Sequence, residues 1–319
     1  MVKIGFYTNQ LCERGTTVAV FDYAYYNQIL LKNISYIFYL KNNTNNNQDM
    51  INKFIKEFTV IPIDNFDDID HYLKENDIRI LHNIKSGGND GLSKVANNVI
   101  QCVFNCGFPH GEVYCAISKY VSSYNNNIPV LPHIVHLPYH EENMRKDLNI
   151  PEDAIVFGRH GGKTQFDIHY VMQVVYNVAK LNPNIYFIFV NTNQFCEKLN
   201  NIIHLDVITD LHLKRKFINT CDAMLWARSD GETFGLAIAE FSICNKPVIA
   251  SKIGYLAHFE TLKEKGLWYS NETELINNIK FIASTDKKIL QSIDWNAYKE
   301  FSPENVMKKY HKIVIKPFI

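Results

Sequence analysis

The chain has 319 residues, enough for two domains of ordinary size, and 46% of them are hydrophobic, enough to build buried cores. Lys plus Arg and Asp plus Glu each number 33, so the chain lacks the overall basic charge that favours nucleic acid. It has no apolar run near the roughly 18 residues that span a bilayer, and no signal-peptide pattern at its start. We therefore expect a cytoplasmic protein with no transmembrane segment and no nucleic-acid partner.

The seven cysteines do not indicate a disulfide framework, because their number is odd and no C-x-x-C pair occurs. Cys102, Cys106 and His110 follow one another at intervals of four, a spacing that could indicate a metal site. A strand would also place Cys102 and Cys106 on one face as small buried residues, which explains them more simply. We therefore expect no metal here.

The first half of the chain alternates between short apolar runs and helical patterns. The run at 2–8 is read as a strand, and a loop ending at Gly15 leads to a helix at 16–31 with Thr16 near its N-cap. Gly15 fits either a close approach to a ligand or an ordinary turn, and a G-x-G-x-x-G fingerprint is absent. This alternation predicts a parallel sheet covered by helices. The further strands are expected at 35–40, 59–63, 78–83, 99–105, 113–117 and 128–135, and the helices at 48–56, 66–74 and from Ser118.

Two histidines lie where predicted strands end, which is where parallel sheets bind ligands. His82 is near the end of the strand at 78–83, and His110 lies between Pro109 and Gly111 in the loop after the next strand. Either histidine is a candidate catalytic residue. An ordinary packed or solvated histidine fits the same positions, because histidine is often merely structural.

A charged stretch near 137–150 is expected to join two domains. A buried strand at 154–158 then leads into Arg159, two glycines and Lys163. Glycines beside cations suit a backbone cradle for phosphate, in which Arg makes bidentate contacts and Lys acts as a point charge. Two solvated charges are the simpler alternative. The remaining elements are expected as strands at 185–190 and 202–205 and as helices at 166–181, 210–219, 272–283 and 303–314.

The stretch from Leu225 to Gly254 reads as strand, loop, helix and strand. Glu232 in the loop and Glu240 in the helix are eight residues apart, so they could hold opposite ends of one elongated ligand. The free N–H groups at the start of the helix would attract an anion such as a diphosphate. The spacing alone favours two solvated glutamates, because charged residues are mostly exposed.

The same stretch resembles the E-x7-E signature of retaining GT-B glycosyltransferases, particularly family 4, the group 1 enzymes. Its elements are Ser229, Glu232, Phe234-Gly235, Glu240 and the run at 246–251 followed by Gly254. The resemblance implies an α/β protein with two Rossmann-like domains facing a central cleft. The domains would cover 1–140 and 150–299, with a C-terminal helix at about 300–319 packing back on the first.

The resemblance also implies a function, the retaining transfer of a sugar from a nucleotide diphosphate sugar to a glycan, lipid or protein acceptor. No metal and no cofactor would be needed, since the nucleotide sugar is a co-substrate. A non-catalytic nucleotide-sugar or glycan-binding protein of the same fold is the alternative, and a sugar-nucleotide epimerase fits less well.

Individual roles follow from the resemblance in the same way. Arg159 and Lys163 match the residues that bind the donor diphosphate. Glu232 would lie near the sugar hydroxyls and Glu240 on the ribose. The backbone of Phe234, Gly235 and Leu236 would complete the phosphate site, Gly15 would lie over the donor, and His110 or His82 would contact the reacting sugar from the first domain.

Overall fold

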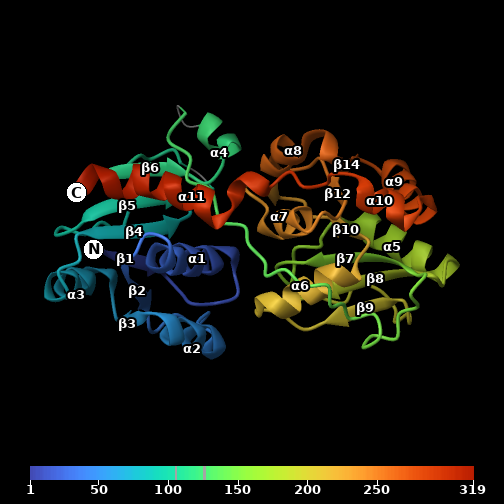
Figure 1. Cartoon of the computed structure of the whole chain (residues 1–319), viewed down its shortest axis with the longest axis horizontal. Helices are drawn as coiled ribbons and strands as arrows, with labels where there is room; N and C mark the ends of the chain where they lie inside the picture. Colours follow the sequence, from blue (N-terminus) through green and yellow to red (C-terminus); the bar gives the residue numbers. More distant parts are fainter. Residues whose placement is uncertain (105, 125–126) are drawn as a thin grey trace. The chain divides into compact units, whose positions relative to one another are not determined.

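The computed structural model describes residues 1–104, 106–124 and 127–319. Its contacts divide the chain into two compact units (Figure 1). The first comprises Met1–Ile134 with Glu300–Ile319, and the second comprises Val135–Lys299. None of the helices in these described ranges is both long enough and apolar enough to cross a membrane.

The first unit is built on a six-stranded sheet in the order β3-β2-β1-β4-β5-β6. All of its neighbouring strands are parallel, which requires a crossover between successive strands and explains the intervening helices. The strands are β1 (Lys3–Thr8), β2 (Ile34–Leu40), β3 (Thr59–Ile63), β4 (Ile80–Lys85), β5 (Asn97–Cys102) and β6 (Val113–Ala116).

Three helices of the first unit, α2, α4 and α11, begin where a side chain accepts from N–H groups of the first turn. The Asn47 side chain accepts from two N–H groups of the next helix, and Ser118 caps the fourth helix as expected. The last helix of the chain contacts the first (Figure 1). The helices are α1 (Gly15–Ile29), α2 (Gln48–Glu57), α3 (Ile69–Glu75), α4 (Lys119–Ser123) and α11 (Pro303–Tyr310), which a π turn (His311–Ile315) follows.

The second unit repeats this plan with a six-stranded parallel sheet in the order β14-β12-β10-β7-β8-β9. The strands are β7 (Ile155–His160), β8 (Ile185–Val190), β9 (Ile202–Leu205), β10 (Ala223–Trp226), β12 (Val248–Ser251) and β14 (Gly266–Tyr269). Two short strands, β11 (Gly231–Glu232) and β13 (Tyr255–Leu256), pair separately.

The core of the second unit lies between this sheet and two helices. Val174 of α5 and Ile279 of α9 pack in one buried cluster with Phe157 and Phe187 of the sheet. The helices are α5 (His169–Leu181), α6 (Leu211–Thr220), α7 (Leu236–Ile243), α8 (Ala257–Leu262), α9 (Glu272–Ser284) and α10 (Lys287–Ser292).

The two parallel sheets confirm the α/β class predicted from the sequence, and the differences lie in single elements. The strand expected at 128–135 is wrong, since this stretch makes only one bridge, between Ala116 and Val130. Pro129 and Pro132 lack the N–H groups that a ladder needs. The strand expected at 99–105 lies at 97–102, and residue 105 is outside the described ranges.

Three helix boundaries also differ from the expectation. The first helix begins at Gly15 without a side-chain cap, so Thr16 is not its N-cap. The helix expected from Phe166 begins at His169, and the last α-helix ends at Tyr310. Boundaries of this kind depend on which backbone groups find partners, and hydrophobic periodicity does not report that.

Candidate functional site

In the second unit, two loops meet at one edge of the sheet. Strands β7 and β10 are parallel neighbours, so the loops that follow them lie at the same edge. Asp167, after the first loop, accepts hydrogen bonds from both the N–H and the hydroxyl of Ser229 in the second, at 2.7 and 2.8 Å. This carboxylate therefore fixes the start of the E-x7-E stretch against the end of β7.

Arg159, near the end of β7, lies in this edge and has no exposed surface. Its guanidinium donates to the carbonyl of Gly162 at 2.9 Å and to the hydroxyl of Thr192, and it lies 5.4 Å from the centre of the Trp226 ring. Burial lowers the pKa of Arg159 to about 10, against the opposing effect of Glu232. Arg159 is thus placed at the predicted strand end, where it holds the glycine loop and the loop after β8.

Glu232, the first acid of the signature, has a partner that the sequence analysis missed. Arg228 lies 3.3 Å from Glu232 and 3.4 Å from Asp230, and the side chains of Arg228 and Glu232 are only 14% and 12% exposed. Burial raises the pKa of Glu232 to about 7, although Arg228 and Arg159 act in the opposite direction. Arg228 and Glu232 lie in a loop and a short strand, where a spacing of four residues does not imply contact, so no signal in the sequence indicated this pair.

The turn between the two acids prepares the start of α7 for an anion. Gly235 precedes the helix with a φ of +85°, a left-handed conformation that favours glycine. The hydroxyl of Tyr298 donates to the carbonyl of Phe234 at 3.1 Å and so fixes the turn. The N–H groups of the first helical turn have no partners within the helix, which gives this end its capacity for an anion.

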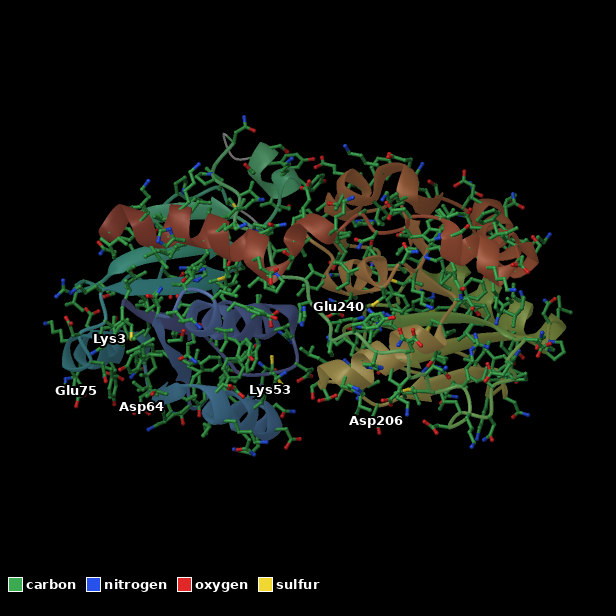
Figure 2. The ribbon with its side chains drawn as sticks, in the orientation of Figure 1. Lys3, Lys53, Asp64, Glu75, Asp206 and Glu240 are labelled. Carbon is green, nitrogen blue, oxygen red and sulfur yellow. The ribbon has the colours of Figure 1, made fainter. Side chains whose placement is uncertain are left out.

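Glu240 lies in the second turn of α7 (Figure 2). Its side chain is almost fully buried. The ammonium of Lys214, on α6, donates to one of its oxygens at 2.8 Å, and Nε2 of His160 lies 2.9 Å from the other at an angle that is not that of a hydrogen bond. Burial alone would raise the pKa of Glu240, but Lys214 and His160 overcome it and lower the pKa to about 2. The sequence analysis did not predict either neighbour.

The other residues predicted for donor binding lie at loop ends. Lys163 is exposed in the loop after β7, where its side chain is not held in the core. Gly15 is exposed and begins α1, after the loop that follows β1. Neither residue is surrounded by hydrogen bonds and ion pairs as Arg159 and Glu240 are. The roles of Lys163 and Gly15 in donor binding therefore remain predictions.

His82 does not lie where a substrate could touch it. Its side chain has no exposed surface and packs among the rings of Phe6, Tyr23 and Tyr310, at centre distances of 5.5, 5.3 and 5.5 Å. Burial lowers the pKa of His82 to about 3, which keeps the ring neutral. The aromatic rings of Phe6, Tyr23 and Tyr310 enclose the imidazole, and this enclosure argues against the predicted catalytic role.

His110 is half-buried in the loop after β5 and stays a candidate. Nε2 lies 3.3 Å from the ammonium of Lys85, and Nδ1 lies 2.6 Å from the carbonyl of Phe108. An ammonium only donates and a carbonyl only accepts, so Nε2 faces a donor and Nδ1 faces an acceptor. Cys102 and Cys106 are both buried, but β5 ends at Cys102, so they do not share a strand face as the simpler explanation expected. They form no metal-binding group with His110 in the described part of the chain.

Comparison with known proteins identifies the fold and the family. The two sheets match glycosyltransferases of the GT-B class. A sequence model of the family described as glycosyl transferases group 1 matches residues 141–300. Because this match covers half of the chain, the protein belongs to the group 1 glycosyltransferases, as its resemblance had indicated.

Solved structures support the fold over nearly the whole chain. A glycosyltransferase from Rickettsia africae is similar with a TM-score of 0.72 and 16% identity, over 99% of this chain and 98% of its own. Anabaena HepE in complex with UDP-glucose gives 0.71 and 14%, over 99% of both chains. WaaG, a glycosyltransferase of lipopolysaccharide biosynthesis, gives 0.69 and 10%, over 98% and 100%. No curated protein sequence matches the chain significantly.

Proposed function

We propose that the protein is a retaining glycosyltransferase that moves a sugar from a nucleoside diphosphate sugar to a glycan, lipid or protein acceptor. The observation that carries the proposal is the arrangement around α7, where Glu232 and Glu240 flank a helix start and Arg159 and Arg228 lie beside the first acid. Membership of the group 1 family supports sugar transfer. The complex of HepE with UDP-glucose supports a nucleotide sugar as donor.

In the proposed reaction, the donor diphosphate lies against the start of α7. The N–H groups there, the positive charge of Arg159 and Arg228, and the exposed Lys163 would stabilise the negative charge that grows on the leaving diphosphate. This is the role that a metal ion has in other transferases, so we propose that the transfer itself needs no metal.

The two acids would recognise the two ends of the donor. Glu240 is an anion at neutral pH because its pKa is about 2, and it would accept hydrogen bonds from the ribose hydroxyls. Glu232 would contact the transferred sugar. In a retaining reaction the acceptor hydroxyl ends on the face of the sugar that the diphosphate leaves. We also propose that His110 contacts the reacting sugar.

Turnover of a panel of nucleotide sugars by purified protein tests the reaction itself. We expect one donor to be transferred or hydrolysed, with retention of anomeric configuration by NMR and with activity preserved in a chelator. Binding of a donor without any turnover would instead identify a non-catalytic nucleotide-sugar binding protein. Loss of turnover in a chelator that Mn²⁺ or Mg²⁺ restores would contradict metal independence.

Binding measurements by calorimetry test the individual roles. Arg159→Ala should weaken nucleoside diphosphate binding by about 1.5–3 kcal/mol, the value of hydrogen bonds to charged groups. Arg79→Ala is the matched control, because Arg79 is an exposed arginine of the first unit paired only with neighbouring Asp77. Unchanged affinity in a folded Arg159→Ala protein would remove Arg159 from the site.

The roles of the two glutamates are distinguished by which ligand each variant fails to bind. Glu240→Gln should impair binding of the free nucleotide and of the nucleotide sugar alike, whereas Glu232→Gln should spare the free nucleotide. Equal loss of nucleotide in both variants would contradict this assignment. Because Glu240→Gln leaves Lys214 without its anion, urea unfolding must show that the variant is folded.

The contribution of the first unit is tested at His110. If this ring contacts the reacting sugar, His110→Ala should lower turnover by about 10²-fold or more with nucleotide affinity intact. His71→Ala is a matched control, since His71 is an exposed histidine of the same unit. Normal turnover in His110→Ala would exclude the side chain from the reaction.

A further inference from the structure

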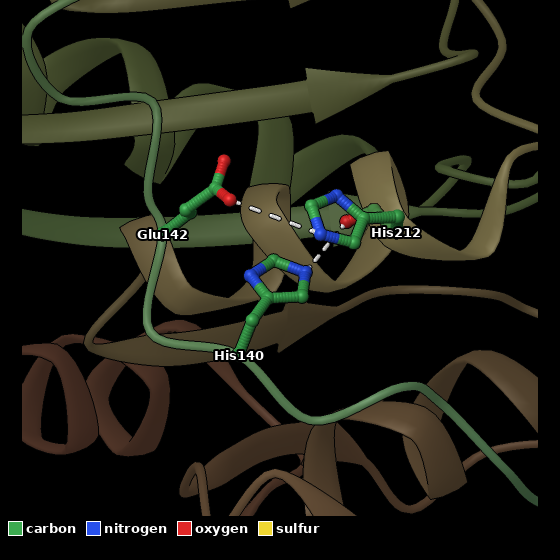
Figure 3. A group of neighbouring side chains, drawn as sticks. All are labelled: His140, Glu142 and His212. Atoms are coloured by element: carbon green, nitrogen blue, oxygen red, sulfur yellow. Dashed lines mark hydrogen bonds and ion pairs between the residues drawn. The ribbon is translucent and has the colours of Figure 1, made fainter.

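The chain that enters the second unit carries two metal-binding side chains beside a third on α6. Among the residues that the structure describes, His140, Glu142 and His212 form the one group whose potential ligand atoms all lie within 4.8 Å of one another (Figure 3). Two imidazoles and a carboxylate are a ligand set that Zn²⁺ accepts, with a water in the fourth position. We propose that these three residues bind Zn²⁺ and so fasten this segment to α6.

The backbone around the three residues is already fixed without an ion. The side-chain amide of Asn219, near the end of α6, donates to the carbonyls of His140 at 2.7 Å and Glu142 at 2.9 Å. The N–H of Met144 donates to the hydroxyl of Thr220 at 2.8 Å. Two of the ligands are therefore held against the helix that carries the third, so little order is lost when an ion binds.

The bonding of His140 leaves one of its nitrogens suited to a metal. Nε2 lies 3.0 Å from the carbonyl oxygen of His212, which can only accept, so Nε2 carries the proton. Nδ1 then has a free lone pair, and this atom is buried without a hydrogen-bond partner among the described residues. A histidine that donates one N–H to a carbonyl and offers its other nitrogen to the metal is the usual arrangement in metal sites.

The other two ligands are close and exposed, so they can turn toward an ion. Nε2 of His212 lies 3.8 Å from Glu142, and the rings of His212 and His140 stack with centres 3.8 Å apart (Figure 3). Both His212 and Glu142 are half or more exposed. Neither side chain is fixed in the core, so both are free to rotate toward an ion at Nδ1 of His140.

The proposed site is separate from the donor-binding residues of the same helix. His212 and Lys214 are two residues apart on α6, and residues at that spacing point to different faces of a helix. Lys214 is buried against Glu240, whereas His212 is exposed. Zn²⁺ at His212 would therefore hold the segment at 140–142 on α6 and take no part in sugar transfer.

Metal titration of the full chain, produced without a polyhistidine tag and freed of metal with a chelator, tests the proposal. We expect one Co²⁺ per chain with the visible absorption of a four-coordinate ion, displaced by one Zn²⁺. Loss of a group outside the ligands already costs roughly 10–100-fold in metal affinity. His140→Ala and His212→Ala should therefore each weaken Zn²⁺ binding by about 100-fold or more, and Glu142→Gln by about tenfold or more.

Two further variants make the test specific. His71→Ala should leave Zn²⁺ affinity unchanged, because His71 and Glu75 offer only two exposed ligands in the first unit. His212→Cys keeps a ligand for Zn²⁺, so it should restore stoichiometric binding and add a thiolate-to-cobalt absorption band. Absence of stoichiometric binding, or equal affinity in wild type, His140→Ala and His212→Ala, would overturn the proposal. Neither donor binding nor turnover enters this measurement, so its failure is distinct from that of the proposed function.

Discussion

The loop that ends at Glu232 and the helix that carries Glu240 place two carboxylates in opposite surroundings. The guanidinium of Arg228 pairs with both Glu232, at 3.3 Å, and Asp230, at 3.4 Å. Burial raises the pKa of Glu232 to about 7. Glu240 is buried as well, but it has Lys214 at 2.8 Å, and its pKa falls to about 2. A buried acid with a close partner of its own stays an anion, whereas one that shares its partner titrates near neutral pH.

This difference fits two kinds of recognition in one donor. A permanent anion suits hydroxyl groups that keep the same charge throughout a reaction, as ribose hydroxyls do. An acid that titrates near neutral pH suits a place where charge changes during the reaction, and neighbouring acids with widely separated pKa values often take separate roles. The roles proposed for Glu240 and Glu232 agree with that division.

The largest effect should follow from removing the partner of Glu240. Lys214→Met leaves a buried carboxylate without its counter-ion, and breaking a buried pair in this way costs about 3–5 kcal/mol. The side chains of Lys214 and Glu240 are only 11% and 7% exposed, so water cannot replace the ammonium. The free energy of unfolding in urea measures the loss.

Lys216→Met is the matched control on the same helix. Lys216 pairs with Asp147, whose side chain is 62% exposed, and exposed pairs contribute about 0–1 kcal/mol. Equal losses of unfolding free energy in the two lysine variants would contradict the dependence of buried Glu240 on Lys214. Glu240 would then need its partner no more than a surface carboxylate does.

The next effect concerns the pH dependence of stability at Glu232. Its pKa in the folded protein is raised to about 7, so between its unfolded value near 4.5 and pH 7 the folded state binds the extra proton. Stability from this group is therefore present below pH 4.5 and lost as pH rises to 7, by about 3 kcal/mol for a shift of this size.

Glu232→Gln removes this titration. Relative to wild type, the variant should gain unfolding free energy between pH 5 and pH 8, measured by urea unfolding at each pH. Glu240 does not interfere, because its lowered pKa makes its contribution present above its unfolded pKa and lost only as pH falls toward 2. A constant difference between variant and wild type across this range would show that Glu232 is ionised throughout.

The sequence predicted the chain positions of the site better than its bonding. Glu232, Gly235 and Glu240 lie at a strand–loop–helix junction, as their spacing indicated, because local patterns determine where such a junction forms. The residues that set the two pKa values were not predicted. Lys214 reaches Glu240 from 26 residues earlier in the chain, and a pattern within one stretch does not report contacts of that range.

The same limit explains why the burial of His82 was not predicted from the sequence. Its position in a strand was predicted correctly, since His82 lies in β4. Its predicted place near the strand end was wrong, because β4 continues to Lys85. Its burial depends on Tyr23 of α1 and on Tyr310, which is 228 residues away near the end of the chain. No local signal shows that the last helix will supply a ring to cover this side chain.

The smallest predicted effect concerns the turn that separates the two acids. Gly235 has a φ of +85°, and a Cβ there would lie 3.4 Å from Cβ and Cγ of Glu232, an ordinary contact. The cost of Gly235→Ala should therefore come from the backbone, where a left-handed conformation costs L-residues about 1–2 kcal/mol. Gly88→Ala is the control, because Gly88 does not have a positive φ and its Cβ would meet only Asp90 at 3.5 Å. Urea unfolding should show a loss for Gly235→Ala alone. Equal stability of the two variants would mean that the turn relaxes to another conformation, and Glu232 would then no longer be held apart from α7 by a fixed left-handed residue.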